Sequence, residues 1–201
     1  MPRITFAGTA AEYGTLDSAS VIRSLMSFYS CKFLGYQDTL CDDKGRHLFK
    51  DCFIQGTVDF IFGNGRSIYL NCMIKSVADG ITYITAQARS TIADKSGFAF
   101  VHCNVTGTGS AYLSRAWKKS SRVVFAYTYM NSVVNPQGWD DSGFKERQGT
   151  VFYGEYKCLG PGASTSRRVS YVKLLTDEQA KPFLSMTFIR GKTWVLRQPQ
   201  L

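Results

Sequence analysis

The chain has 201 residues, 44% of them hydrophobic and 19% charged, which is typical of a folded globular protein and excludes an intrinsically disordered one. Lys and Arg number 24 against 15 Asp and Glu, so the formal net charge of +9 favours a polyanionic partner. The cations are scattered, and no window resembles a membrane span or a signal peptide. We therefore expect one domain over residues 1–201, a monomer that binds neither nucleic acid nor a membrane.

A repeat with a constant offset is the first structural signal along the chain. Segment 28–38 can be laid over segment 49–59, with matching residues 21 positions apart at five places: Phe28 and Phe49, Cys31 and Cys52, Phe33 and Ile54, Gly35 and Gly56, Asp38 and Asp59. Weaker copies follow at 69–74, 100–105, 124–130 and 151–158. Each copy is rich in β-branched and aromatic residues and bounded by turn residues, which predicts a strand.

Repeats of this length predict a solenoid in which every coil buries its inner face against its neighbours. Helical periodicity is poor, and the spacing is too short for βαβ units, so an all-β parallel β-helix fits best. A leucine-rich repeat is the main competitor, but its leucine signature is missing. The predicted fold class is therefore all-β, with a β-helix architecture.

The C-terminal tail has a different pattern. Thr176 followed by Gln179 three residues later predicts a capping box and a short helix. Phe183, Phe188 and Trp194 are expected to pack this helical and loop segment over the end of the solenoid as a cap.

The six cysteines predict neither a disulfide scaffold nor a metal site. Four of them recur at equivalent repeat positions and should form a buried column: Cys31, Cys52, Cys72 and Cys103. The two histidines, His47 and His102, do not stand at zinc-ligand spacing. We expect no metal.

Two aspartates at equivalent repeat positions are the candidate chemical centre. If the coils stack, Asp38 and Asp59 lie about 4.8 Å apart, and two carboxylates that close divide into a proton donor and a charged nucleophile or base. Arg115 is a candidate partner for the buried charge, Trp117 could stack on a sugar ring, and Gln37 could donate to an oxyanion. The alternative is a polar ladder along the turns with a structural ion pair.

Five segments resemble the plant cell-wall type of pectin methylesterase. They are 35–40 (G-Y-Q-D-T-L), 56–63 (G-T-V-D-F-I-F-G), 84–89 (similar to T-A-Q-G-R), 112–117 (similar to Y-L-G-R-P-W) and the pair Gly138-Trp139. The resemblance runs from about residue 2 to residue 196 and is carried mainly by the first two segments, which are long and specific.

The resemblance implies a right-handed parallel β-helix that removes methyl esters from homogalacturonan without a cofactor. Asp59 would be the nucleophile, Asp38 the acid and base, and Gln37 the oxyanion stabiliser. Arg115 and Trp117 would bind substrate. It also implies an extracellular location in the plant cell wall and a proteinaceous pectinesterase inhibitor as a partner.

The sequence also departs from the family pattern. The Q-A-V-A-L segment, whose glutamine is the family's other oxyanion donor, is absent, and about two coils are missing near Val21–Ser27, besides a truncated N-terminus. One alternative is therefore a catalytically impaired relative that still binds acidic cell-wall polysaccharide. Another is a pectate lyase or polygalacturonase, which would need further acidic clusters, and Asp42-Asp43 is the only adjacent acid pair near the aspartates.

Overall fold

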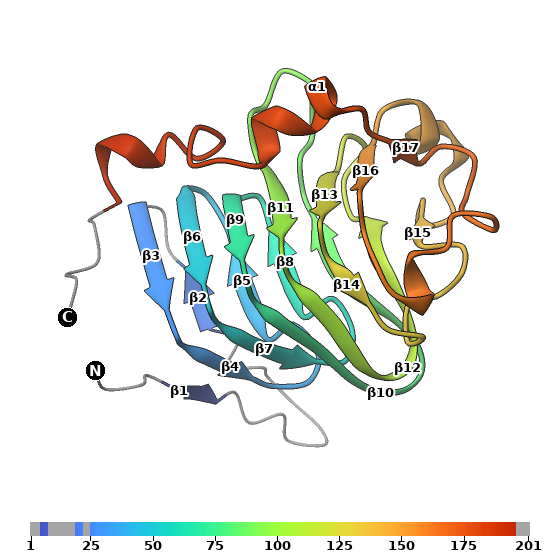
Figure 1. Ribbon diagram of the computed structural model, residues 1–201, viewed down its shortest axis with the longest axis horizontal. Helices are drawn as coiled ribbons and strands as arrows, with labels where there is room; N and C mark the ends of the chain where they lie inside the picture. The colour runs from blue at the N-terminus through green and yellow to red at the C-terminus, as the bar shows by residue number, and fades with distance from the viewer. Residues whose placement is uncertain (1–4, 8–18, 22–24, 196–201) are drawn as a thin grey trace.

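The computed structural model describes residues 5–7, 19–21 and 25–195 (Figure 1). The expected position of the internal deletion includes residues 22–24, which lie outside the described residues, as does most of the N-terminal segment 1–18. None of the helices in the described part of the chain is long and apolar enough to cross a membrane.

Two sheets form the body of the molecule. Sheet A has ten strands: β1 (Thr5–Ala7), β2 (Ala19–Val21), β4 (Lys32–Leu34), β5 (Leu40–Asp42), β7 (Phe53–Gly56), β8 (Ile61–Gly63), β10 (Met73–Gln87), β12 (Asn104–Ala116), β14 (Tyr129–Met130) and β15 (Trp139–Asp140). Sheet B has seven: β3 (Leu25–Tyr29), β6 (Arg46–Lys50), β9 (Arg66–Leu70), β11 (Gly97–Val101), β13 (Arg122–Ala126), β16 (Phe152–Tyr156) and β17 (Lys173–Leu174).

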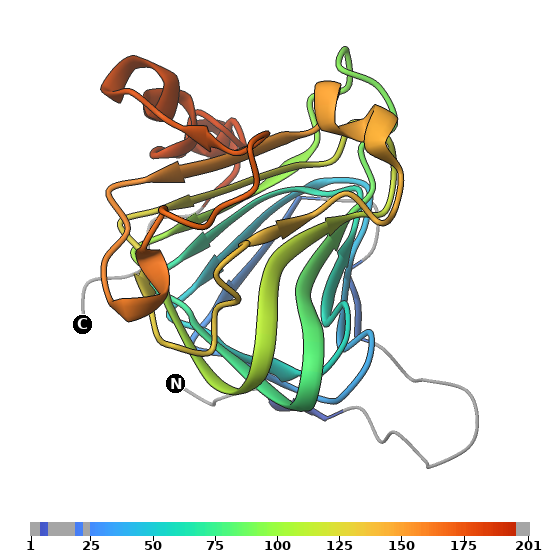
Figure 2. The same ribbon diagram turned by 90° about the vertical axis from the view of Figure 1, so that its right-hand side faces the viewer.

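Every strand pairing between successive coils is parallel, and the chain passes from sheet A to sheet B once in each coil (Figure 2). One coil is β4-β5-β6 and the next is β7-β8-β9; in the following two coils the sheet A stretches merge into the long strands β10 and β12. Phe28 lies in register with Phe49, and Phe33 with Ile54, as the repeat predicted. The predicted parallel β-helix is confirmed.

The space between the sheets is filled by side chains stacked along the solenoid. Five aromatic rings form one column, with centroid separations of 5.0, 4.7, 4.4 and 4.4 Å in the order Phe28, Phe49, Tyr69, Phe100 and Phe125. The predicted cysteine column lies in the same core, and Cys158 packs against this core as well. Cys31, Cys52, Cys72, Cys103 and Cys158 are free thiols. Thiols in the column donate to carbonyl oxygens of the preceding coil, for example Cys72 Sγ to the Phe49 oxygen at 3.4 Å.

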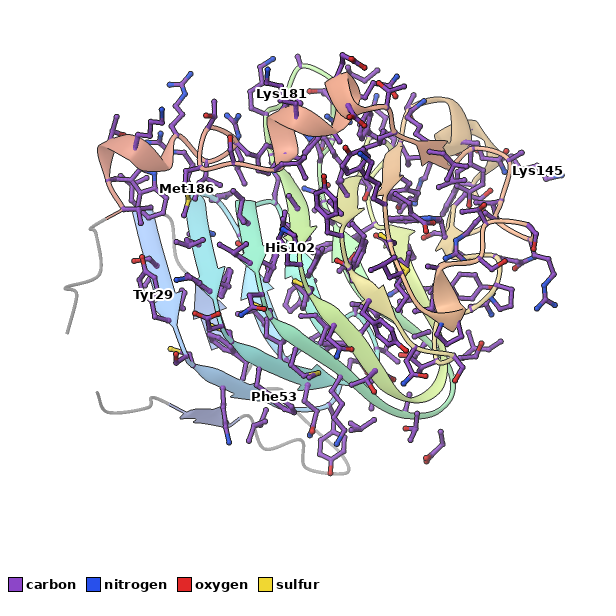
Figure 3. All side chains as sticks on the ribbon, viewed as in Figure 1. Tyr29, Phe53, His102, Lys145, Lys181 and Met186 are labelled. Carbon is purple, nitrogen blue, oxygen red and sulfur yellow. The ribbon has the colours of Figure 1, made fainter. Side chains whose placement is uncertain are left out.

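The tail contains α1 (Asp177–Ala180) and the 3-10 turns Lys181–Phe183 and Gly191–Thr193; two further 3-10 turns lie at Lys145–Gly149 and Pro161–Ala163. The predicted capping box of α1 is present, with Thr176 and Gln179 bonding each other's backbone. The expected place of the tail was wrong: Phe183 and Phe188 pack on outward side chains of sheet B, so the tail runs along the side of the solenoid and not over its end. Figure 3 shows Met186 on this tail above the sheet.

Candidate active site

The two aspartates lie at turns of sheet A where one strand of a coil ends and the next begins. Asp38 stands between β4 and β5, and Asp59 between β7 and β8. Both have left-handed backbone conformations, with φ of 54° and 50°, which aspartate tolerates better than most residues. The turns are tied across coils, because the Asp38 amide donates to the Val58 oxygen at 3.0 Å and the Asp59 amide to the Tyr83 oxygen at 2.8 Å.

Gly56 allows these two turns to approach each other. A Cβ at this position would lie 2.2 Å from Phe60 Cβ and 2.5 Å from the backbone oxygen of Tyr36, both too close for a side chain. The same backbone oxygen of Tyr36 accepts a hydrogen bond from the Thr57 amide at 2.9 Å. The glycine that opens the G-T-V-D segment is thus required by contact between adjacent coils.

Arg115, near the end of β12, holds Asp59 in one orientation. Its Nε lies 2.9 Å from both carboxylate oxygens of Asp59, and its NH2 group donates to Oδ2 as well. The side chain of Asp59 is 7% exposed and that of Arg115 is 40% exposed. The guanidinium also lies over the ring of Tyr83, 5.2 Å from its centroid, so the arginine is positioned from two sides.

The two carboxyl groups differ in their electrostatic surroundings. Burial raises the pKa of Asp59, and the hydrogen bonds and charge of Arg115 oppose this rise. Burial and then the charge of Asp59 raise the pKa of Asp38, which has only the charge of Arg115 to oppose them. Asp59 is therefore the carboxylate with a fixed cationic partner, and Asp38 is the one that a neighbouring negative charge favours as the neutral acid.

All five predicted site residues line one cavity of about 200 Å³. Its walls are Gln37, Asp38, Asp59, Phe62, Ala86, Arg115 and Trp117. Gln37 is exposed, and Trp117 is 46% exposed. β12 ends at Ala116, and Trp117 follows it at the start of the next turn and lines the cavity.

Phe62 and Ala86 were not predicted as site residues. Phe62 lies on β8, where burial alternates, so its ring is directed outward and meets Trp117 edge-on at a centroid distance of 6.0 Å. That alternation within the G-T-V-D-F-I-F-G segment is the signal that could have identified Phe62. Ala86 lies on β10, paired with Phe62 and Arg115 in the neighbouring coils, and its small side chain leaves room for the cavity.

No group of three or more His, Cys, Asp or Glu residues in the described ranges is arranged to hold a metal ion. The cavity presents two carboxyl groups of unequal acidity, a guanidinium, an amide and an aromatic face. Such a set can carry out nucleophilic and acid–base steps on a bound ester.

The fold and the site define a class of protein. It is a parallel β-helix with two aspartates on one sheet, one of which is hydrogen-bonded to an arginine. Comparison with known proteins then gives the family. The sequence matches the family model described as Pectinesterase over residues 3–192, and the chain belongs to this family.

Similar proteins include pectinesterase 63 of Arabidopsis thaliana, which is 47% identical and aligns with 99% of this chain and 70% of its own length. Pectinesterase 2 of Olea europaea is 42% identical, with 98% of this chain and 63% of its own length covered. Among solved structures, a pectin methylesterase from carrot superposes with a TM-score of 0.79 at 34% identity, covering 84% of this chain and 58% of that one.

The chain spans 54% to 70% of the length of the curated relatives it matches. The alignment with the Arabidopsis protein extends over 235 positions, and this chain has only 201 residues, so at least 34 of those positions have no residue of this chain. An internal deletion is consistent with this difference.

Proposed function

We propose that the protein is a carboxylic ester hydrolase that removes methyl esters from homogalacturonan, giving pectate and methanol. The observation that carries this proposal is the cavity in which Asp59, held by Arg115, lies beside the more readily protonated Asp38. A relative at 26% identity and a TM-score of 0.69 is a pectin methylesterase in complex with a hexasaccharide, which supports a saccharide as the ligand here.

In the first half of the proposed reaction, a carboxylate oxygen of Asp59 attacks the ester carbonyl carbon. The developing oxyanion accepts a hydrogen bond from the Gln37 amide, which lies on the cavity rim. Collapse of this intermediate breaks the bond to the methoxy group, which leaves as methanol with the proton of Asp38. Asp59 is then joined to the galacturonate as an acyl-enzyme.

In the second half, Asp38 is a carboxylate and acts as a base. It takes a proton from a water molecule, whose oxygen attacks the acyl carbon. This proton restores the neutral form of Asp38. The bond to Asp59 then breaks, Asp59 leaves as a carboxylate, and the galacturonic acid group of the product gives its proton to solvent. Arg115 keeps Asp59 ionised before the attack and holds it in place through both halves. Trp117 with Phe62 forms an apolar wall for a sugar ring.

A second candidate function is binding of acidic polysaccharide without turnover. It is favoured by one observation, the absence of the Q-A-V-A-L segment and of its oxyanion donor. Loss of one such donor lowers kcat by roughly 10² to 10³. The cavity retains Gln37 as a donor, so we expect reduced rather than abolished turnover.

Methanol release from highly methylated pectin, with a chelator present and no added metal, tests the proposal. Asp59→Asn is the matched control, because asparagine also tolerates the left-handed backbone at this position. We expect release by the wild type and none by the variant, with both folded by circular dichroism. Equal release by both proteins would overturn the role of Asp59, and pectin binding without release would support the second candidate.

We further propose that the protein acts outside the cell on the plant cell wall, as a monomer and under the control of a proteinaceous inhibitor. Relatives at 42% and 47% identity from the plants Olea europaea and Arabidopsis thaliana support this location. Gel filtration of the purified chain, alone and with a pectinesterase inhibitor, would check the last two points.

A further inference from the structure

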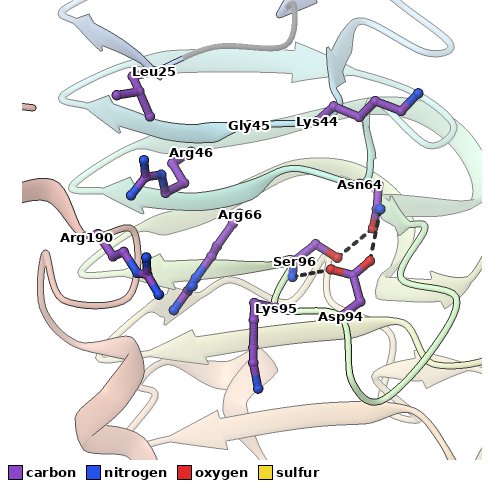
Figure 4. A pocket seen from close by; sticks show the side chains of 10 residues that line it. All are labelled: Leu25, Lys44, Gly45, Arg46, Asn64, Arg66, Asp94, Lys95, Ser96 and Arg190. Carbon is purple, nitrogen blue, oxygen red and sulfur yellow. Dashed lines mark hydrogen bonds between the residues drawn. The ribbon is translucent and has the colours of Figure 1, made fainter.

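A second cavity lies where the chain passes from sheet A to sheet B, and it shares no lining residue with the catalytic cavity. Its volume is about 550 Å³, and it is bounded by the turns before β6 and β9, the loop before β11 and the tail (Figure 4). Five of its ten lining residues are cations: Lys44, Arg46, Arg66, Lys95 and Arg190. We call this cavity the basic pocket.

The residues that line the basic pocket do not neutralise its positive charge. Asp94 is its single acidic lining residue, and its carboxylate already accepts hydrogen bonds from Asn64 Nδ2 at 3.2 Å and from the Ser96 amide at 2.9 Å. The salt bridges found in the described part of the chain involve none of the five cations. The pocket is therefore a concentration of uncompensated positive charge.

Three guanidinium groups gather at one end of the pocket. Figure 4 shows those of Arg46, Arg66 and Arg190 close to one another. Arg46 and Arg66 are register partners on adjacent strands, and Arg66 is also positioned by the ring of Phe188, 5.1 Å from its centroid. The Nε of Arg66 is buried and has no hydrogen-bond partner among the described residues.

Mutual repulsion acts on these groups. Burial, followed by the charges of Arg190 and Arg46, lowers the pKa of Arg66. Below the pocket, Arg122 donates to the Ser96 oxygen at 2.7 Å, and burial with the charges of Arg89 and Arg66 lowers its pKa to about 10. An anion in the pocket would relieve this repulsion, and a planar guanidinium can bind a carboxylate through two parallel hydrogen bonds.

We propose that the basic pocket binds carboxylates of a de-esterified galacturonan segment, at a place separate from the catalytic cavity. This inference rests on the proposed function, because the proposed product is a polymer that gains one carboxylate with every ester removed. The volume of about 550 Å³ lies within the range of sites for organic ligands and exceeds what one inorganic anion would fill. Binding of product here would hold the enzyme on polymer that it has already de-esterified.

Calorimetric titration with trigalacturonate, which has no ester to hydrolyse, tests the inference. The test variant is Arg46→Gln/Arg190→Gln, which removes two charges and leaves Arg66 in its contact with Phe188. The control is Arg167→Gln/Lys181→Gln, an equal charge change at two exposed residues outside the pocket. We expect two binding events in the wild type and the control, and loss or at least tenfold weakening of one event in the test variant.

Three results would overturn the inference. One is the same binding in all three proteins. Another is a second binding event weakened equally by both double variants. The third is a pocket that binds inorganic phosphate but not trigalacturonate, which would make it a site for a phosphate anion. Methanol release measured on the same proteins separates this inference from the proposed function, because the double variants leave the catalytic cavity intact and should retain the wild-type rate on short methylated oligomers.

Discussion

The hydrogen bonds from Arg115 to Asp59 predict that a substitution of Arg115 changes the pH dependence of methanol release. Replacing Arg115 with Gln removes the charge and all three hydrogen bonds to the Asp59 carboxylate while keeping a polar side chain. Asp59 then stays buried without a neighbouring cation. Because the hydrogen bonds and charge of Arg115 no longer oppose the effect of burial, the pKa of Asp59 rises further. Since Asp59 must be ionised to attack, less of the enzyme is competent at any mildly acidic pH.

The size of the effect follows from the strength of the contact. Hydrogen bonds to charged groups contribute about 1.5–3 kcal/mol, and the 40% exposure of the Arg115 side chain places this contact toward the lower end because water screens it. A free energy of 1.36 kcal/mol corresponds to tenfold in rate. We expect kcat/KM to fall roughly tenfold to hundredfold, and Arg115→Lys, which keeps the charge without the planar fork, to fall less.

Methanol release as a function of pH is the assay, with wild type, Arg115→Gln and Arg115→Lys compared. The acid limb of kcat/KM reports the essential base of the free enzyme, and it should move to higher pH in Arg115→Gln. A rate loss with the acid limb unchanged would refute the reasoning and leave Arg115 as a residue that contacts only substrate.

Three further predictions concern the fold and its titration. Because the pKa of Asp38 is raised, the folded state holds more protons than the unfolded chain between the ordinary value of about 3.9 and the folded value, so stability falls as pH rises through that window. In urea unfolding at several pH values, Asp38→Asn should remove the part of this fall that Asp38 contributes and leave the part due to Asp59, whose pKa is also raised. Phe100→Ala breaks the aromatic column between Tyr69 and Phe125 and should lower the free energy of unfolding by about 3–5 kcal/mol, against no loss at exposed Lys181→Ala. Gly107→Ala should yield little folded protein in an expression and thermal-melting comparison with Gly149→Ala, because a Cβ at Gly107 would lie 1.9 Å from the Ser76 oxygen, whereas nothing lies near Gly149.

The fold could be predicted because a solenoid repeats its local pattern. The offset of 21 residues between segments 28–38 and 49–59 reappears as the register of β3 on β6 and of β4 on β7. Equivalent positions therefore stack, and that alone brings Asp38 near Asp59 and Cys31 near Cys52. Arg115 is 56 residues away from Asp59 and has no periodic relation to it, so it was proposed from the need of a buried carboxylate for a cation and from the motif resemblance.

The sequence by itself determined the coil, its register and the identity of five of the seven residues around the catalytic cavity, because these depend on short segments that repeat or match a pattern. Only the tertiary structure decided that the tail lies along sheet B, where Phe183 and Phe188 cover outward side chains of several coils. It also decided that Arg46, Arg66 and Arg190 meet in one pocket. Arg190 reaches this place through packing of the non-repeating tail, and such long-range packing leaves no period in the sequence from which it could be read.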